Sequence, residues 1–156
     1  MIIMGYPGIG KSSVAKEDYR FIDLDSADRL IHGKYGRNKR WEEAYCNMAL
    51  LLSKQGYIVF VSTHPEVRKR IISKEKNPVL CYPNITLKDE WIKRLYSRYQ
   101  DGKNRPTHNA WRRAKDHFDE DYDSLSKEKC HQLILYDMDY NLKKDILELK
   151  SYLESK

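Results

Sequence analysis

The protein has 156 residues, of which 40% are hydrophobic and 33% are charged, and its formal net charge is +6. This length fits a single domain over residues 1–156, and the apolar content excludes an intrinsically disordered chain. The excess of lysine and arginine suits an anionic partner, a nucleotide or a nucleic acid, and the charge alone does not separate the two. No apolar run approaches the ~20 residues of a membrane span. The three cysteines lack the spacing of a metal site, so we expect a cytoplasmic protein with reduced thiols and no signal peptide.

The first dozen residues carry the strongest motif in the sequence. Residues 5–12 read GYPGIGKS, which fits the phosphate-binding pattern G-x-x-x-x-G-K-[ST], and the apolar run before them supplies the strand that this motif needs. Glycines allow the backbone to approach a phosphate, and the loop amides form a nest for an anion. We expect Lys11 to reach the phosphates of ATP and the Ser12 hydroxyl to hold Mg²⁺. The predicted nucleotide-binding residues are Gly5, Gly8, Ile9, Gly10, Lys11, Ser12 and Ser13.

Hydrophobic patterning predicts that strands and helices alternate along the rest of the chain, which is typical of a parallel α/β sheet. After the apolar run at the N-terminus, the expected strands cover residues 19–25, 57–61, 78–82 and 132–136. The expected helices cover residues 12–18, a segment starting at Asp25, 41–52 with a cap at Gly56, 63–72 capped by Thr63, 86–99 capped by Thr86 or Asp89, and 142–153.

Two basic segments interrupt this pattern. Residues 34–40 contain four cations and a glycine, which predicts a loop that either meets an anion or is simply solvated. Residues 102–113 contain Lys103, Arg105, Arg112 and Arg113, with Gly102 and Pro106 as helix breakers, and predict a mobile basic flap that leads into a helix ending near Phe118. An acidic run over 116–123 follows, and we interpret it as a solvated face.

Polar side chains follow two of the predicted strands at the edge where a parallel sheet binds its ligands. Asp23 and Asp25 are two residues apart on the predicted strand and therefore point to the same face. One of them could attend Mg²⁺ while the other reaches the acceptor, although Asp25 could instead cap the following helix. Ser62 or Thr63 stands where many P-loop enzymes have a magnesium-binding aspartate. His64 is interpreted as a helix cap or a surface residue in preference to an acceptor contact.

These motifs together resemble a known group of enzymes. The loop over 5–12, the sequence FIDLD over 21–25, and a helix with Arg94 and Arg98 before a basic flap are similar to the nucleoside monophosphate kinase and shikimate kinase-like group of P-loop kinases. The similarity is greatest to compact nucleotide kinase-like proteins encoded by phages. The resemblance implies a three-layer P-loop NTPase fold, with a five-stranded parallel sheet, helices on both faces and a basic lid over about 100–118.

The resemblance also implies roles for individual residues. The loop over 5–12 would bind the phosphates of ATP, Asp23 or Asp25 would work near Mg²⁺ and the acceptor, and three arginines would belong to a lid over the transferring phosphate. The predicted catalytic residues are Lys11, Asp23, Asp25, Arg94, Arg98 and Arg105, and the predicted metal ligands are Ser12 and Asp23. The sequence departs from the group in its short first helix, and in having SerThrHis over 62–64 where shikimate kinases have a glycine-rich acceptor loop.

Three functions fit these observations. The first is a kinase for a (deoxy)nucleoside monophosphate, whose phosphate could be held by the basic residues over 34–40 and which needs no general base. The second is a kinase for a hydroxyl on a small metabolite, a modified base or a nucleic-acid end, in which Asp23 or Asp25 would be the base. The third is an ATP-dependent nucleic-acid-binding module without an acceptor, which the net charge motivates. We expect no membrane partner.

Overall fold

A computed structural model describes residues 1–24, 32–33, 36–37 and 40–156. The main sheet has five parallel strands in the order β2-β5-β1-β6-β7, so the strand before the glycine-rich loop lies at its centre. A separate antiparallel pair, β3-β4, lies apart from it. The strands are β1 (Ile2–Gly5), β2 (Phe21–Asp23), β3 (His32–Gly33), β4 (Gly36–Arg37), β5 (Ile58–Val61), β6 (Val79–Pro83) and β7 (His131–Leu135).

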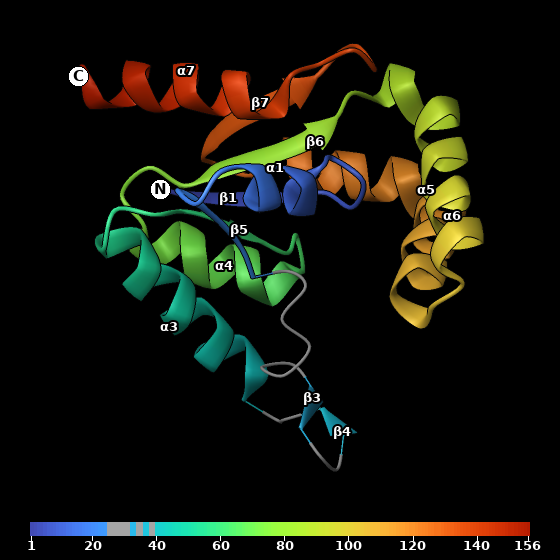
Figure 1. Cartoon of the computed structure of the whole chain (residues 1–156), viewed down its shortest axis with the longest axis horizontal. Coiled ribbons are helices and arrows are strands. Elements are labelled where there is room, and N and C mark those ends of the chain that lie inside the picture. Colours follow the sequence, from blue (N-terminus) through green and yellow to red (C-terminus); the bar gives the residue numbers. More distant parts are fainter. Residues whose placement is uncertain (25–31, 34–35, 38–39) are drawn as a thin grey trace.

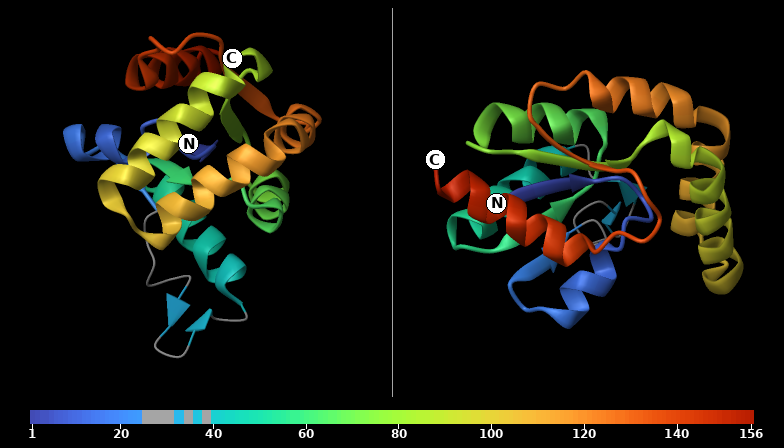
Figure 2. Two further views of the ribbon diagram at one scale, coloured as in Figure 1. Left: turned by 90° about the vertical axis from the view of Figure 1, so that its right-hand side faces the viewer. Right: turned by 90° about the horizontal axis from the view of Figure 1, so that it is seen from above.

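Helices cover both faces of the main sheet, as the sequence predicts. Figures 1 and 2 show α1 and α7 on one face and α3 and α4 on the other. Helices α5 and α6 form a hairpin at one end of the sheet, and the second half of α6 runs back over the face that α4 covers, where Tyr122 contacts Tyr82 of β6. A short 3₁₀ turn, η1, precedes α5. The bounds are α1 (Lys11–Glu17), α3 (Trp41–Lys54), α4 (Pro65–Lys74), η1 (Ile85–Leu87), α5 (Lys88–Gly102), α6 (Arg105–Ser126) and α7 (Leu142–Glu154).

The three central strands are buried on both faces, which explains their continuous apolar sequences. Every residue of β1, β5 and β6 is buried. The register pairs Met4 with Val61 and Gly5 with Cys81, and on the other side of β5 it pairs Asp23 with Phe60. The carboxyl ends of β1, β2 and β5 therefore lie at the same edge, and the loop after β1 lies between the ends of β5 and β6.

The segment predicted as an irregular basic flap is helical. Lys103 and Asn104 form a tight turn between α5 and α6, and α6 then runs from Arg105 to Ser126 with a local break at His117. Asn104 caps α6 by accepting a hydrogen bond from Thr107 N at 2.9 Å. A proline in the first turn of a helix removes only an amide that has no intrahelical partner. The residues read as breakers in the sequence therefore lie at the end of one helix and the start of the next.

Other predicted boundaries also shift. Strand β2 is shorter than predicted, and α4 is capped by His64, whose Nδ1 accepts from Glu66 N at 3.3 Å, and not by Thr63. Neither Thr86 nor Asp89 caps α5, which begins after Leu87 without a side-chain cap. Asp25 and the helix predicted to start there lie outside the described residues, as does most of the basic segment over 34–40. Within the described ranges, no helix is both long and apolar enough to cross a bilayer.

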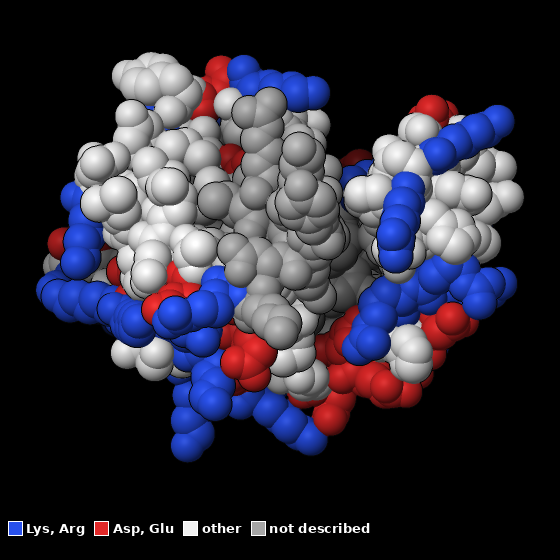
Figure 3. Space-filling model, turned by 90° about the horizontal axis from the view of Figure 1, so that it is seen from below, with Lys and Arg blue, Asp and Glu red and all other residues white. Residues whose placement is uncertain are grey.

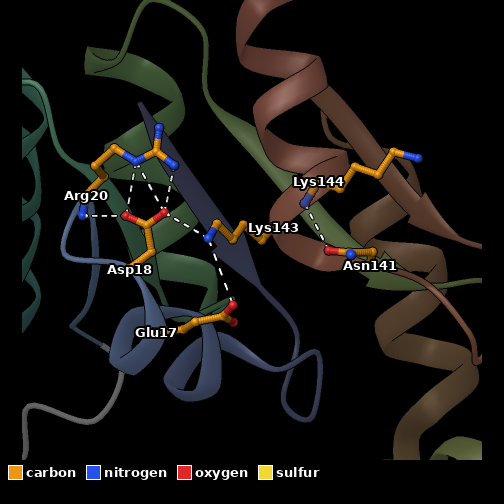
Figure 4. A network of polar contacts seen from close by, with 6 residues as sticks. All are labelled: Glu17, Asp18, Arg20, Asn141, Lys143 and Lys144. Atoms are coloured by element: carbon orange, nitrogen blue, oxygen red, sulfur yellow. Dashed lines mark hydrogen bonds and ion pairs between the residues drawn. The ribbon is translucent and has the colours of Figure 1, made fainter.

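A network of charged side chains joins the end of α1 to the start of α7 (Figure 4). Arg20 Nη2 lies 2.7 Å from Asp18 Oδ2, and Lys143 Nζ from α7 lies 3.2 Å from the same oxygen. Lys143 also lies 4.0 Å from Glu17. The hydrogen bonds from Arg20, with a further contribution from Lys143, hold the pKa of the Asp18 carboxyl well below its usual range. This network fastens α7 to the helix that follows the glycine-rich loop.

We predict that Asp18→Asn lowers the melting temperature at pH 7, because Arg20 and Lys143 lose their shared anion. The pKa of Asp18 is lower in the folded than in the unfolded chain. Its stabilisation is therefore complete above the ordinary carboxyl pKa of about 4, and is lost as the pH falls through the folded value. Thermal unfolding at several pH values should show the difference between wild type and variant shrinking below about pH 4.

Glu17→Gln is the matched control for this prediction. Glu17 contacts the same lysine at 4.0 Å from a side chain that is 69% exposed, so its removal should leave the melting temperature nearly unchanged. Equal losses for the two variants would contradict the assignment of Asp18 as the centre of the network.

Candidate functional site

The loop between β1 and α1 has a conformation that requires glycine at three positions. Gly8 has φ +90° and Gly10 has φ +106°, which L side chains rarely adopt. A Cβ on Gly5 would lie 2.7 Å from Ile9 Cδ1 and 2.9 Å from a side-chain carbon of Lys11. The spacing of glycines in the motif is thus explained by backbone conformation at two positions and by close approach at the third.

Three consecutive carbonyls of this loop are held by side chains from distant parts of the chain. The hydrogen bonds run from Trp91 Nε1 to Pro7 O (2.9 Å), from Arg94 Nη1 to Gly8 O (3.3 Å) and from Tyr140 OH to Ile9 O (2.7 Å). We call Trp91, Arg94 and Tyr140 the loop clamp. Trp91 and Arg94 come from α5, and Tyr140 comes from the segment between β7 and α7.

The loop clamp determines where the loop amides point. The peptides are trans, so the N–H of each peptide points away from its own carbonyl. Fixing the three carbonyls on the side of α5 and Tyr140 therefore directs the N–H groups of Gly8, Ile9 and Gly10 to the opposite side. Among the residues that the structure describes, none accepts a hydrogen bond from these three amides. They are donors available to an anion.

The members of the clamp also contact one another. The Arg94 guanidinium carbon lies 4.6 Å from the centre of the Trp91 ring and 5.5 Å from that of Tyr140, and Arg94 Nη1 donates to Tyr140 OH at 2.7 Å. Burial raises the pKa of Tyr140, so its phenol keeps the proton that it donates to Ile9 O. Arg94 therefore holds one loop carbonyl directly and another through Tyr140.

A cavity of about 910 Å³ borders the loop, which is within the ~300–1,000 Å³ typical of small-molecule sites. Lys11 is 7% exposed, and its Nζ donates to Gly5 O at 2.7 Å, while the hydroxyl-bearing residues Ser12 and Ser13 are exposed. The predicted site residues that line the cavity are Gly8, Gly10, Lys11, Ser12, Ser13, Asp23, Arg94 and Arg98.

The donor set of this cavity fits magnesium. Ser12 and Asp23 both line it and offer hard oxygen ligands, and Mg²⁺ in phosphate-transfer sites commonly takes only one or two ligands from the protein. No cluster of three or more histidine, cysteine or acidic side chains occurs in the described part of the chain, so a dedicated all-protein metal cage is not present there. Asp25, the other predicted carboxylate, lies outside the described residues.

The three predicted lid arginines occupy different positions. Arg98 is exposed and lines the cavity, with its Nη1 3.6 Å from the place that a Cβ on Gly8 would take. Arg94 lies against the loop carbonyls as part of the clamp. Arg105 is exposed at the first position of α6, between Asn104 and Pro106, which both line the cavity. The hairpin that carries these arginines forms the lobe on the right in Figure 3, where several Lys and Arg side chains gather.

A second cavity of about 640 Å³ adjoins the first, since Pro7 and Ala110 line both. It lies at the end of β5 and contains Ser62, Thr63 and His64, the residues that replace a glycine-rich acceptor loop. His64 caps α4, as the sequence suggests, and its ring also lies 5.3 Å from that of Trp41. The sequence therefore predicts correctly that these residues gather near the loop.

Two arginines line the second cavity without having been predicted as site residues. Arg68 is only 6% exposed; its Nη2 donates to Ser124 Oγ at 3.0 Å and its Nη1 lies 3.4 Å from Glu128 Oε1, while its Nε has no hydrogen-bond partner. Arg113 is paired with Asp121, which also lines the cavity. No sequence signal distinguishes Arg68 from the other cations of α4, because its burial arises from packing against α6.

A third cavity, of about 890 Å³, lies on the other side of the loop, between α1 and α7. It shares Gly10, Ser13, Arg94 and Tyr140 with the first cavity. Three cavities that share lining residues thus adjoin the loop, from the end of β5, past Lys11, to the groove beside α7.

Solved structures share this arrangement of elements. The fold is similar to that of shikimate kinase from Bacteroides thetaiotaomicron, with a TM-score of 0.55 and 15% sequence identity over 98% of this chain and 97% of that chain. The protein has a three-layer P-loop fold, with a five-stranded parallel sheet and helices on both faces. A weaker likeness, with a TM-score of 0.47 and 10% identity over 99% of this chain and 97% of that chain, relates it to an uncharacterized protein from Eubacterium ventriosum ATCC 27560.

No family model and no curated protein sequence matches the chain. The predicted fold class is confirmed, and so is the resemblance to the shikimate kinase-like group at the level of fold. Neither of these two structures connects the chain with phage-encoded nucleotide kinase-like proteins in particular. A shared fold does not by itself establish an activity, which depends on the site.

We predict that Gly8→Ala destabilises the protein more than Gly56→Ala. Both glycines have positive φ, and alanine there costs roughly 1–2 kcal/mol. A Cβ on Gly56 would meet nothing within 4 Å, whereas a Cβ on Gly8 would lie 3.0 Å from Leu95 Cδ2 and 3.2 Å from Trp91 Nε1. Denaturant unfolding should therefore show an additional loss of about 1 kcal/mol or more for Gly8→Ala. Equal losses would mean that α5 does not press on the loop as closely as the structure has it.

Proposed function

We propose that this protein is a magnesium-dependent phosphotransferase that uses ATP, and that its acceptor is a (deoxy)nucleoside monophosphate. The observation that carries the proposal is the glycine-rich loop: no described residue accepts a hydrogen bond from its amides at residues 8–10, and Gly8, Gly10 and Lys11 line a cavity together with Ser12, Asp23 and Arg98. Anion donors, a lysine, two oxygen ligands and an arginine are the groups that phosphoryl transfer requires.

Each group would have a distinct role. The amides of residues 8–10 and Lys11 would hold the β- and γ-phosphates, which requires Lys11 to leave its bond to Gly5 O. Ser12 and Asp23 would hold Mg²⁺, which supplies charge neutralisation at the phosphates. Arg98 and Arg105 would neutralise charge on the transferring group, a role that can be worth about 10³–10⁵ in rate. The hairpin that carries them would exclude water from the site.

The second cavity is the candidate acceptor site. It adjoins the loop at Pro7, and its walls carry Arg68 and Arg113 together with the hydroxyl groups of Ser62 and Thr63. A buried arginine with an unsatisfied Nε favours an acceptor that carries an anionic group. A monophosphate provides both the anion and the attacking oxygen, so the site needs no general base.

The second candidate is a kinase that phosphorylates a hydroxyl group. The presence of Asp23 in the cavity favours it, because a carboxylate there could accept the proton of the attacking hydroxyl. The fold similarity to a shikimate kinase, which by its name acts on a small metabolite, is compatible with this candidate.

We predict that ADP is released from Mg-ATP when a nucleoside monophosphate is added, and that Lys11→Ala lowers this rate by about 100-fold or more because a donor to the developing charge is lost. The assay uses separate reactions with monophosphates, with small hydroxylated metabolites and with DNA or RNA oligonucleotides. ADP release with monophosphates alone supports the proposal, and release with hydroxylated acceptors alone replaces it with the second candidate. Slow hydrolysis stimulated by nucleic acid and sensitive to salt would indicate the nucleic-acid module instead. Activity that survives Lys11→Ala would remove the enzyme assignment.

Asp23→Asn separates the two kinase candidates. If the acceptor is a monophosphate and Asp23 only binds magnesium, the variant should need more Mg²⁺ but recover most of its kcat, within about tenfold, at saturating metal. If Asp23 is the base for a hydroxyl, kcat should fall by about 10²–10⁴ at any metal concentration while ATP affinity is retained. Steady-state kinetics over a magnesium titration distinguish these outcomes.

A further inference from the structure

The loop clamp has a geometry that does more than attach α5 to the sheet. Its three donors lie 84, 86 and 131 residues from the carbonyls that they hold, and those carbonyls belong to consecutive peptides. A helix that was only docked on the loop would need no such match between successive donors and successive acceptors. The amides opposite these carbonyls are the ones that the proposed function assigns to the nucleotide.

We propose that Trp91, Arg94 and Tyr140 are positioning residues for nucleotide binding, which hold the loop amides in their binding orientation before the nucleotide arrives. This inference rests on the proposed function, since it takes the loop as a phosphate site. It changes the role of Arg94: instead of contacting the transferring phosphate from a lid, Arg94 acts through the loop backbone.

The physical reason is preorganisation. Glycine has the greatest backbone freedom of any residue type. Without the loop clamp, the backbone at Gly8 and Gly10 would therefore sample many peptide orientations. Ordering a residue costs roughly 1–2 kcal/mol, and a loop ordered only on binding would take that cost from the nucleotide affinity. The hydrogen bonds to the carbonyls order the loop already when the protein folds and the apolar residues of α5 are buried. The entropy cost of ordering the loop is then part of folding and does not reduce the nucleotide affinity.

Arg94 and Tyr140 act as a coupled unit within the clamp. Arg94 Nη1 donates both to Gly8 O and to the Tyr140 oxygen, and Tyr140 uses its only proton for Ile9 O. Loss of the Tyr140 hydroxyl therefore leaves Ile9 O without this donor. It also removes one hydrogen-bond acceptor of Arg94, the residue that donates to Gly8 O. The same two side chains line both the cavity at Lys11 and the groove beside α7.

Tyr140→Phe tests the proposal, and Tyr136→Phe is its control. The first substitution removes the hydroxyl that holds Ile9 O but keeps the ring that contacts Trp91 and Arg94. Tyr136 is 68% exposed just after β7 and lines none of the three cavities around the loop. Isothermal titration with Mg-ADP and, separately, with adenosine measures the phosphate-dependent part of the affinity.

We expect Tyr140→Phe to weaken Mg-ADP binding about 5- to 30-fold, as the loss of two coupled hydrogen bonds implies, while adenosine affinity and the control variant are unchanged. The KM for the acceptor should also be unchanged. Unaltered ADP affinity in Tyr140→Phe would overturn the proposal. Equal losses of affinity for ADP and adenosine would also overturn it, because they would indicate an effect on binding of the nucleoside and not on binding of the phosphates by the loop amides. Wild-type protein that binds no ADP would overturn the proposed function as well.

Arg94→Gln is a second variant, which tests the proposal even if Tyr140→Phe fails to fold. Its effect on ADP affinity should be smaller in the Tyr140→Phe background than in wild type, because part of its action passes through Tyr140. Fully additive effects would refute the coupled arrangement. Amide hydrogen exchange at Gly8, Ile9 and Gly10 in the protein without nucleotide should be faster in Arg94→Gln than in wild type, and unchanged exchange would refute preorganisation.

Discussion

The contact between the glycine-rich loop and the side chains of α5 and Tyr140 is the constraint on which the site depends. A polypeptide loop rich in glycine has no preferred way to direct its amides, and the motif alone supplies none. In this protein, consecutive carbonyls are held by donors from outside the loop, and the amides of the same peptides have no acceptor among the described residues. The orientation of the loop amides therefore depends on tertiary structure as well as on local sequence.

The sheet provides the frame for this contact. Because β1 is the central strand and runs parallel to its neighbours, the loop emerges between the ends of β5 and β6, next to the carboxylate of β2. Its main chain is joined to the sheet again where Tyr6 N donates to Cys81 O at 2.9 Å. The hairpin of α5 and α6 closes the open side, and the charged network around Asp18 fixes α7 to the helix after the loop. The three cavities described above lie beside the loop, where these layers do not meet.

The sequence predicted the features that depend on local patterns. The motif over 5–12 identified the loop, and the continuous apolar run over 57–61 identified a central strand. The hairpin was missed because Gly102 and Pro106 were read as breakers, whereas the cap by Asn104 lets a helix begin between them. Trp91 lies within the helix predicted over 86–99 but was given no role, and Tyr140 was not singled out. Their hydrogen bonds to the loop join residues far apart in the chain, which no local pattern encodes.

The attachment of α5 also determines how the two-helix lobe can move. Trp91, Arg94 and Leu95 all lie against the loop, so the first half of α5 is attached to the loop. At the other end of the lobe, α6 is interrupted at His117, just before it buries Phe118 against Tyr6. Arg98 and Arg105 lie in the stretch between these two attachments. Both guanidinium groups are therefore carried by the part of the lobe whose position the two attachments constrain least.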